Sequence, residues 1–315
     1  MHSQNRYSLV VMTHNRPGPL ARCLESIDCF DWTGGIPEVV VVDDGSEPPV
    51  HFGEQGFKVL KPVVVRLEHL GVAAARNAGI DHSNEAFIAF IADDYILPPD
   101  YLTNIDTFFG DHPEAQVISH SIKPCGPYLF RPVQQLYFDL ALGQSIPQEQ
   151  AGQNVVYSSE LPASRAAMFR REVFDQVGRF NESLRVGEDG EFGQRMAAAG
   201  IPVYFFPHKR ISHYDVQSSA DYFRQRLRYG RSFVRAGMWG GSLESMTRSS
   251  FLLRIPRMLK NKLASWWTVA GRLNLRWRYV LLTPFLVLFL LYFYFGAYAE
   301  FCDLRKSGFQ ELDQP

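Results

Sequence analysis

The stretch 85-EAFIAFIADDYILPPDYL-102 decides the fold class of this chain. Its apolar run Phe87–Ala92 is short and rich in aromatic and β-branched side chains, which is typical of a strand buried in a parallel sheet. Asp93 and Asp94 follow directly, where ligands of open α/β sheets bind. Adjacent carboxylates repel each other unless a cation or a proton relieves their charge, and their oxygens suit Mg²⁺ or Mn²⁺. Taken alone, such a pair is more often a solvated turn than a ligand site.

Two earlier strands also end in polar residues, and the second of them ends in a pair of aspartates. The apolar run 8–12 leads into Thr13, Asn15 and Arg16 ahead of a helix, and such a turn presents backbone N–H groups that suit a phosphate or nucleotide. The run 39–42 leads into Asp43 and Asp44, where a carboxylate can accept from a base N–H or a ribose hydroxyl. An Asx turn is the alternative for that second pair. The repeated pattern predicts an α/β fold with an acidic, ligand-binding sheet edge.

Three further polar positions carry candidate chemistry. Arg76 is the one cation in the small-residue helix expected over 71–79, and it can face a diphosphate. Glu188 and Asp189 lie at the N-terminus of an expected helix, either as ordinary capping residues or as a general base. His213 comes after a strand expected over 203–206. It is either a structural hydrogen-bonding residue or a ligand that completes a metal shell begun by Asp94.

The order and spacing of these motifs resemble the family 2 glycosyltransferases, which have the GT-A fold, over about residues 7–215. The segments that carry the resemblance are 10-VVMTHNRP-17, 41-VVDDGS-46, 71–79, Asp93-Asp94, 169–182, 187-GED-189 and His213. The resemblance implies a Rossmann-like, mostly parallel sheet flanked by helices. It also implies an inverting transfer of a sugar from a nucleotide diphosphate to an acceptor hydroxyl.

The resemblance also assigns roles. Residues expected to bind the nucleotide sugar are Thr13, Asn15, Arg16, Asp43, Asp44, Arg76, Asp93 and Glu188. Asp94 and His213 match the ligands of a divalent cation, Mn²⁺ or Mg²⁺, and Asp189 matches the base that deprotonates the acceptor. One position departs from the pattern: Ala92 stands where the family usually has the first aspartate of Asp-x-Asp. Ala92 cannot make the ribose or metal contact of that aspartate, which leaves donor affinity and donor identity open.

Charge divides the chain into regions. Residues 1–221 carry 17 Lys and Arg against 28 Asp and Glu, whereas residues 222–278 carry 13 basic residues and one acid, Glu244. We therefore expect a catalytic domain over 1–221 and a basic amphipathic helical neck over 222–278. A membrane helix over 279–299 and a short polar tail over 300–315 complete the expected organisation. The four cysteines show no metal or disulfide spacing.

The neck and the following helix predict contact with a membrane. Residues 251–267 mix apolar side chains and tryptophans with arginine and lysine, as in a helix lying in a membrane interface. Residues 279–299 are uncharged and long enough to span a bilayer. Lipid contact is expected over 251–299, single-pass or peripheral, and a buried helix or a homodimer interface is the alternative. Arg272, Arg276 and Arg278 place the preceding side, with the catalytic body, at the cytoplasmic face.

The sequence thus predicts a membrane-attached inverting glycosyltransferase that elongates a lipid-linked or cell-surface glycan. A nucleotidyltransferase and a non-catalytic nucleotide-sugar-binding membrane protein are the alternatives. Nucleic acid is not expected as a partner, because it accounts for the arginines of the neck but not for their apolar neighbours. Neither a G-x-G-x-x-G nor a P-loop pattern occurs, so hydride transfer and ATP hydrolysis have no support.

Overall fold

The computed structural model describes residues 7–31, 33–52, 57–158, 166–184, 187–235, 239 and 243–308. Its strands are β1 (Tyr7–Thr13), β2 (Glu38–Asp43), β3 (Val63–Arg66), β4 (Phe87–Ala92), β5 (Tyr95–Ile96), β6 (Val117–Pro124), β7 (Val156–Ser158), β8 (Met168–Arg170) and β9 (Val203–His213). Its helices are α1 (Pro17–Asp28), α2 (Val72–Asp81), α3 (Tyr101–Asp111), α4 (Arg131–Ser145), the 3₁₀ turn η1 (Gln148–Gln150), α5 (Glu172–Val177), α6 (Glu188–Ala198), α7 (Ser219–Arg235), α8 (Arg248–Arg272) and α9 (Arg276–Lys306).

The chain forms two compact units. Residues 1–123 and 145–214 make the sheet unit, and residues 124–144 and 215–315 make the helical unit. These units differ from the expected continuous domain over 1–221, because residues 124–144 leave the sheet and join the C-terminal helices. The expected tail over 300–315 also differs: α9 continues through Lys306, and residues 309–315 lie outside the described part.

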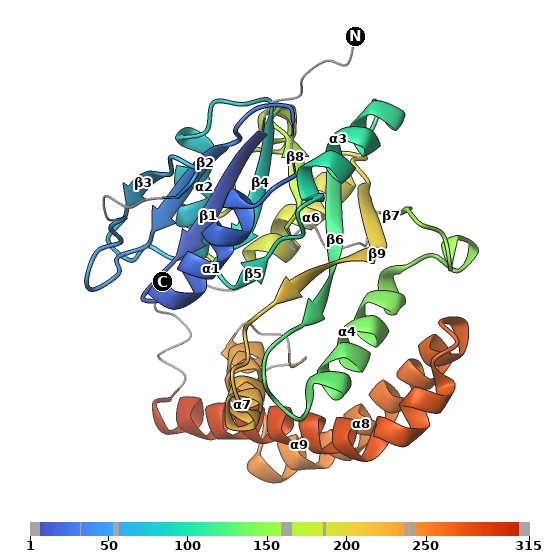
Figure 1. The fold of residues 1–315 in the computed structure, drawn as a ribbon. Coiled ribbons are helices and arrows are strands. Elements are labelled where there is room, and N and C mark those ends of the chain that lie inside the picture. The colour runs from blue at the N-terminus through green and yellow to red at the C-terminus, as the bar shows by residue number, and fades with distance from the viewer. Residues whose placement is uncertain are drawn as a thin grey trace. The chain divides into compact units, whose positions relative to one another are not determined.

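The sheet unit is built on one mixed sheet with strand order β3-β2-β1-β4-β8-β6-β9-β5, and β7 adds to β9 (Figure 1). Strands β3, β2, β1 and β4 run parallel, as their continuous apolar runs predict. Pairing turns antiparallel from β4 to β8 and stays so between β8 and β6 and between β9 and β5. The predicted α/β sheet flanked by helices is confirmed, with the parallel arrangement confined to its first half.

The position of α2 against this sheet depends on a small residue. A Cβ on Gly79 would lie 2.2 Å from Val10 Cγ1, so only glycine lets α2 pack this closely on β1. The close packing fixes the N-terminal half of α2, with Arg76, over the carboxyl ends of the parallel strands.

The helical unit has its own core, formed by one face of each of α4, α7, α8 and α9. Helices α7 and α9 touch backbone to backbone, because a Cβ on Gly230 would meet the Phe293 carbonyl and one on Gly296 would meet the Leu227 carbonyl. Glu300 of α9 is 1% exposed and pairs with Arg231 and Arg235 of α7. These contacts explain why α9 stays helical and packed beyond residue 299.

Candidate active site

Three parallel strands end side by side and bring the predicted site residues together. The register places Thr13 of β1 beside Asp43 of β2 and Met12 beside Ala92 of β4. The polar residues after each strand therefore meet at one edge of the sheet, because parallel strands share a carboxyl edge.

Asp93 and Asp94 form one cluster with the turn after β1. Asp93 accepts a hydrogen bond from the Thr13 hydroxyl at 2.7 Å. The Arg16 guanidinium spans both carboxylates, with Nη1 at 2.7 Å from Asp93 Oδ1 and Nη2 at 2.9 Å from Asp94 Oδ2. Both aspartates are buried, whereas the Arg16 side chain is 40% exposed. Arg16 therefore neutralises part of the negative charge of Asp93 and Asp94, which from the sequence alone was expected to need a bound cation or a proton.

His213 reaches this cluster through the sheet. Strand β9 does not end near residue 206, as the sequence predicted, but continues to His213 and pairs with the short strand β5. That pairing sets His213 opposite Tyr95, and the Tyr214 amide donates to the Asp94 carbonyl at 2.8 Å. His213 Nε2 then lies 3.3 Å from Asp94 Oδ1. Two residues far apart in the chain are thus brought into contact.

Asp43 and Asp44 have different surroundings. Asp43 is fully buried and accepts from the Ser46 and Val50 amides and from the Arg66 guanidinium, so both of its oxygens organise the loop after β2. Its pKa is lowered by these hydrogen bonds and by Arg66, against the effect of burial, which acts in the raising direction and is the largest single influence.

Asp44 accepts from the Leu70 and Gly71 amides at the start of α2, at 2.7 and 3.0 Å, and lines the cavity described below. The structure therefore places Asp44, and not Asp43, where a ligand can reach it.

Arg76 and Glu188 form a buried ion pair. Arg76 Nη1 lies 2.6 Å from Glu188 Oε1, and both side chains are at most one tenth exposed. The Arg76 guanidinium also lies over the Phe180 ring at 5.0 Å from its centre. The pair connects α2 to the first turn of α6, and Asp189 is the next residue of that turn. Asp189 is half-buried and its Oδ1 accepts from the Gly190 amide at 2.8 Å.

An open cavity of about 310 Å³ lies at this strand edge. Of the predicted residues it is lined by Thr13, Arg16, Asp44, Arg76 and Asp93. It is also lined by Ala92, the position that departs from the family pattern, and by residues that the sequence did not single out, namely Met12, His14, Val72, Ala75 and Phe90. The other predicted site residues do not line this cavity; they are Asn15, Asp43, Asp94, Glu188, Asp189 and His213.

His14 is a lining residue that sequence reasoning missed. Its ring stacks on His69, with 4.1 Å between ring centres, and its Nδ1 lies 2.7 Å from the Asp44 carbonyl oxygen. The turn after β1 contains His14, so its position could have been expected. Nothing in the sequence pairs it with His69, which β2 and the loop before α2 bring into place.

Asn15 has a structural role in the same turn. It adopts φ 52°, a left-handed conformation that asparagine tolerates better than most residues. Its amide donates to the Ser46 hydroxyl and its side-chain oxygen accepts from the Glu47 amide. Asn15 and Arg16 also line a second, more apolar cavity of about 730 Å³, whose other walls include Leu20 and Phe52. The side chain of Arg16 thus borders both cavities.

The two neighbouring carboxyls of the cluster titrate far apart. Burial raises the pKa of Asp93 to about 6, although Arg16 and the Thr13 hydroxyl oppose the shift. Burial acts in the same direction on Asp94, but the contact with His213 and the charges of His213 and Arg16 lower its pKa to about 2. Asp94 is therefore the permanently ionised member of the pair.

Within the described ranges, no group of three or more His, Cys, Asp or Glu side chains is arranged to hold a metal ion. Two donors still fit part of a cation shell. Asp94 Oδ1 is buried without a hydrogen bond of good geometry, and His213 Nε2 is its neighbour at 3.3 Å. Mg²⁺ is commonly held by one or two protein ligands together with substrate phosphates. The pair fits a cation of that kind, with Arg16 as a competing charge on the other oxygen of Asp94.

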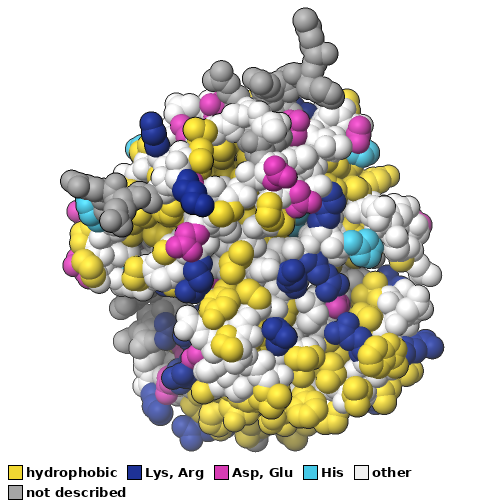
Figure 2. Space-filling model, viewed as in Figure 1, with side chains coloured by type: hydrophobic (Ala, Val, Ile, Leu, Met, Phe, Trp, Pro, Cys, Tyr) yellow, Lys and Arg dark blue, Asp and Glu magenta, His cyan; other side chains and the backbone are white. Residues whose placement is uncertain are grey.

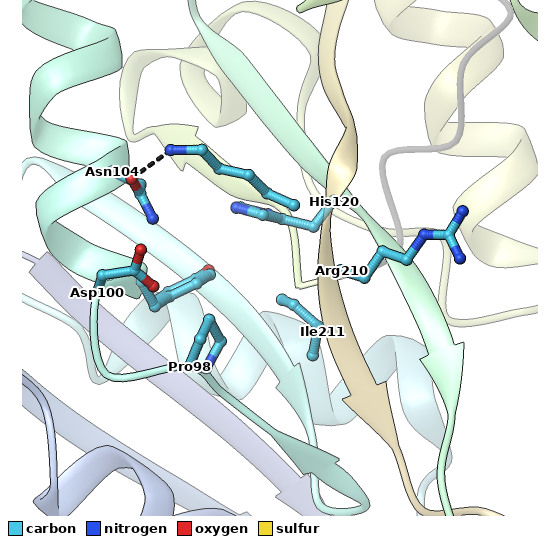
Figure 3. Close-up of a pocket in the computed structure, with 8 residues that line it drawn as sticks. Pro98, Asp100, Asn104, His120, Arg210 and Ile211 are labelled. Atoms are coloured by element: carbon cyan, nitrogen blue, oxygen red, sulfur yellow. Dashed lines mark hydrogen bonds between the residues drawn. The ribbon is translucent and has the colours of Figure 1, made fainter. Parts of the chain in front are cut away.

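A third, smaller cavity of about 190 Å³ lies away from the strand-end cluster, between α3, β6 and β9 (Figure 3). Lys209 contacts Asn104 across it, and burial lowers the pKa of His120 to about 4. None of the predicted site residues lines this cavity.

Comparison with known proteins agrees with the resemblance. A family model described as Glycosyl transferase family 2 matches residues 8–178. The chain is 24% identical over 191 residues to an uncharacterized glycosyltransferase of Haemophilus influenzae, covering 59% of this chain and 60% of that protein. It is 27% identical over 237 residues to the pre-mycofactocin glycosyltransferase of Mycobacterium tuberculosis, covering 73% of this chain and 47% of that protein. The chain thus spans about half to three fifths of the length of these relatives.

Solved structures show the same fold. The S. aureus TarS 1–349 structure superposes with a TM-score of 0.50 at 18% identity, covering 96% of this chain and 92% of that one. TarS 1–349 in complex with UDP-GlcNAc gives a TM-score of 0.51 at 17% identity, with the same coverage. At this identity the likeness establishes architecture only. The family model spans more than half of the chain and the named relatives are glycosyltransferases, so the resemblance read from the sequence is confirmed: the chain belongs to glycosyl transferase family 2.

Proposed function

We propose that the chain is an inverting glycosyltransferase that moves a sugar from a nucleotide diphosphate to an acceptor hydroxyl. One observation carries the proposal. Side chains from the ends of β1, β2 and β4 and from α2 surround a single cavity that holds two arginines and two aspartates. Family membership supplies the reaction class, and this arrangement supplies complementary partners for a diphosphate and a nucleoside.

The donor is expected to bind with its diphosphate toward Arg16 and Arg76. Guanidinium groups match phosphate oxygens in charge and geometry, and both arginines line the cavity. Asp44 is the carboxylate within reach of a base N–H or a ribose hydroxyl, whereas Asp43 acts by holding the loop that presents it.

Asp189 is proposed as the general base. As the acceptor oxygen forms its bond to the anomeric carbon, the bond from that carbon to the diphosphate breaks, and Asp189 takes the hydroxyl proton. Its neighbour Glu188 is tied to Arg76, a lining residue, which holds the first turn of α6 near the cavity. One base and one direct displacement give inversion.

A bound Mn²⁺ or Mg²⁺ supplies charge neutralisation for the departing diphosphate. Asp94 and His213 are the residues that would hold it, since His213 Nε2 lies 3.3 Å from Asp94 Oδ1.

The acceptor is proposed to be a lipid-linked or cell-surface glycan, and the catalytic unit is placed on the cytoplasmic face of the membrane. The basic stretch 248–278 supports this placement, because the cytoplasmic leaflet carries anionic lipids that attract basic segments. Cytoplasmic nucleotide sugars would then have direct access to the cavity.

Thermal denaturation with a panel of nucleotide sugars, each with and without Mn²⁺, tests the donor site. A ligand at 100 times its Kd should stabilise the fold by about 2.7 kcal/mol. Asp94→Ala should remove the Mn²⁺-dependent part, and Asp189→Asn should keep donor binding but lose transfer. Asp175→Asn, at an exposed carboxylate of α5, is the matched control. A panel in which no nucleotide sugar stabilises the protein would refute the proposal.

A further inference from the structure

Helix α9 exposes a continuous apolar stripe along one face. Its members recur every three or four residues, so they lie on one side of the helix. They are Trp277, Val280, Leu281, Phe285, Leu288, Leu291, Tyr292 and Phe295, and their exposed fractions run from 36% to 68%. We call this set the α9 stripe. A contiguous exposed apolar surface of this kind marks a site of contact with another apolar phase.

The opposite face of α9 is already occupied. Leu286, Phe289, Ala297 and Phe301 are at most 1% exposed in the core of the helical unit. Within the described residues α9 is the one helix long and apolar enough to cross a bilayer. Spanning would require it to leave α7, which would expose that core and separate the buried Glu300 from its two arginines. The packing therefore favours a helix that keeps one face on the protein.

Positive charge borders the stripe. Between residues 248 and 278 the chain carries eight Lys and Arg and no Asp or Glu. Arg276 lies over the Trp267 ring at 5.1 Å, and Trp267 itself is 43% exposed beside the start of α9. Figure 2 shows hydrophobic side chains gathered over the lower helices, with Lys and Arg around them. Apolar and aromatic side chains bordered by cations are the surface that anionic membranes attract.

We propose that the α9 stripe docks the helical unit onto an anionic lipid surface, with α9 lying in the plane of the membrane and not across it. A second copy of the chain is a less suitable occupant. A two-fold contact would bring the cation-rich margins of two identical patches together, where like charges repel. Membrane docking is a property beyond the transfer reaction, and it can be tested without a sugar donor. Failure of the docking proposal and failure of the proposed reaction can therefore be distinguished.

Co-sedimentation of the full chain with lipid vesicles tests the docking. We expect binding to phosphatidylcholine vesicles that contain an anionic phospholipid, and much weaker binding to phosphatidylcholine alone. Leu281→Ser with Phe295→Ser removes two anchors that are 64% and 65% exposed, and should weaken binding more than tenfold. The matched control is Ile36→Ser with Val63→Ser, two positions that are 62% and 53% exposed in the sheet unit. It should bind as the unsubstituted chain does.

A second variant isolates the charge. Arg254→Gln, Arg257→Gln and Lys260→Gln change exposed residues of α8 and should reduce the preference for anionic vesicles and its sensitivity to salt. Vesicle binding that survives the loss of both anchors would overturn the proposal. So would a chain that binds no vesicles but forms a dimer which the anchor variant dissociates.

Depth measurements separate an in-plane helix from a spanning one. The variants are Leu281→Trp, Leu288→Trp and Phe295→Trp, each made separately. For each one, the quenching of tryptophan fluorescence by lipids brominated at different depths is measured and compared with that of the unsubstituted chain. Each position is two turns from the next on the same face, so an in-plane α9 gives equal depths. A spanning helix would change depth by roughly 10 Å between neighbours, and that pattern would overturn the in-plane arrangement.

Discussion

Replacing Asp93 by asparagine tests the electrostatics of the strand-end cluster. Burial raises the pKa of Asp93 from 3.8 to about 6, so the folded state binds this proton more tightly than the unfolded chain does. The associated stability is fully present below pH 4 and is lost as the pH rises through 6. A shift of about two units corresponds to about 3 kcal/mol, because each unit is worth 1.36 kcal/mol. About 2 kcal/mol of that is lost between pH 4.5 and 7.5.

The assay is urea unfolding, followed by circular dichroism at intervals over that pH range, with EDTA present so that no cation binds Asp94. As the pH rises, the unsubstituted chain should lose about 2 kcal/mol of unfolding free energy that the Asp93→Asn variant does not lose, because the variant has no carboxyl to ionise at this position. Asp175→Asn, an isosteric change at an exposed carboxylate, is the control. A difference that stays constant with pH would refute the reasoning, since it would mean that Arg16 and Thr13 offset the burial of Asp93 completely.

Three further outcomes are expected. Arg76→Met should lower the free energy of unfolding by about 3–5 kcal/mol, measured in urea, because it leaves the buried Glu188 carboxylate without its partner. Adding Glu188→Met should recover most of that loss, whereas additive losses from the two substitutions would contradict the pairing. Gly230→Ala should lower the melting temperature sharply, because its Cβ would meet the Phe293 carbonyl, whereas Gly110→Ala, in open space on α3, should be neutral or stabilising. Asp189→Asn should reduce transfer by about 10²–10⁴-fold with donor affinity retained, and an unchanged rate would exclude this residue as the base.

The parallel half of the sheet was predictable because its signals are local. The runs 8–12, 39–42 and 87–92 are apolar apart from Ser8 at the start of the first, and they fold as β1, β2 and β4 within a residue at either end. Strand β9 was harder to predict, because Pro207, His208, Lys209 and Arg210 break its apolar pattern. Pairing with β7 at residues 203–205 and with β5 at residues 212–213 fixes the strand on both sides of this polar segment, and such long-range pairing has no sequence signal.

The residues of the site were predictable, but their roles relative to one another were not. Sequence order cannot show that Asp44 lines the cavity whereas Asp43 lies buried beneath the loop after β2 and does not. Nor can it show that Glu188 is committed to Arg76, 112 positions away in the chain. Both outcomes depend on three-dimensional contacts between segments that the motif pattern treats as independent. The same reason accounts for His14, which gains its place through His69.

Ala92 is the position where the site departs from its family, and the structure indicates how the chain accommodates it. Ala92 lines the cavity, so the carboxylate that usually occupies its place is missing from the ligand's side of the cluster. Asp93 also lines the cavity, but its two oxygens accept from Thr13 and Arg16. Its carboxylate is therefore turned toward these protein donors. We infer that donor affinity depends on Arg16 and Arg76 more than on a second aspartate. Ala92→Asp should then change how strongly donor binding depends on a cation, which titration calorimetry with and without Mn²⁺ would measure. The same cation dependence in the variant and the unsubstituted chain would contradict this inference.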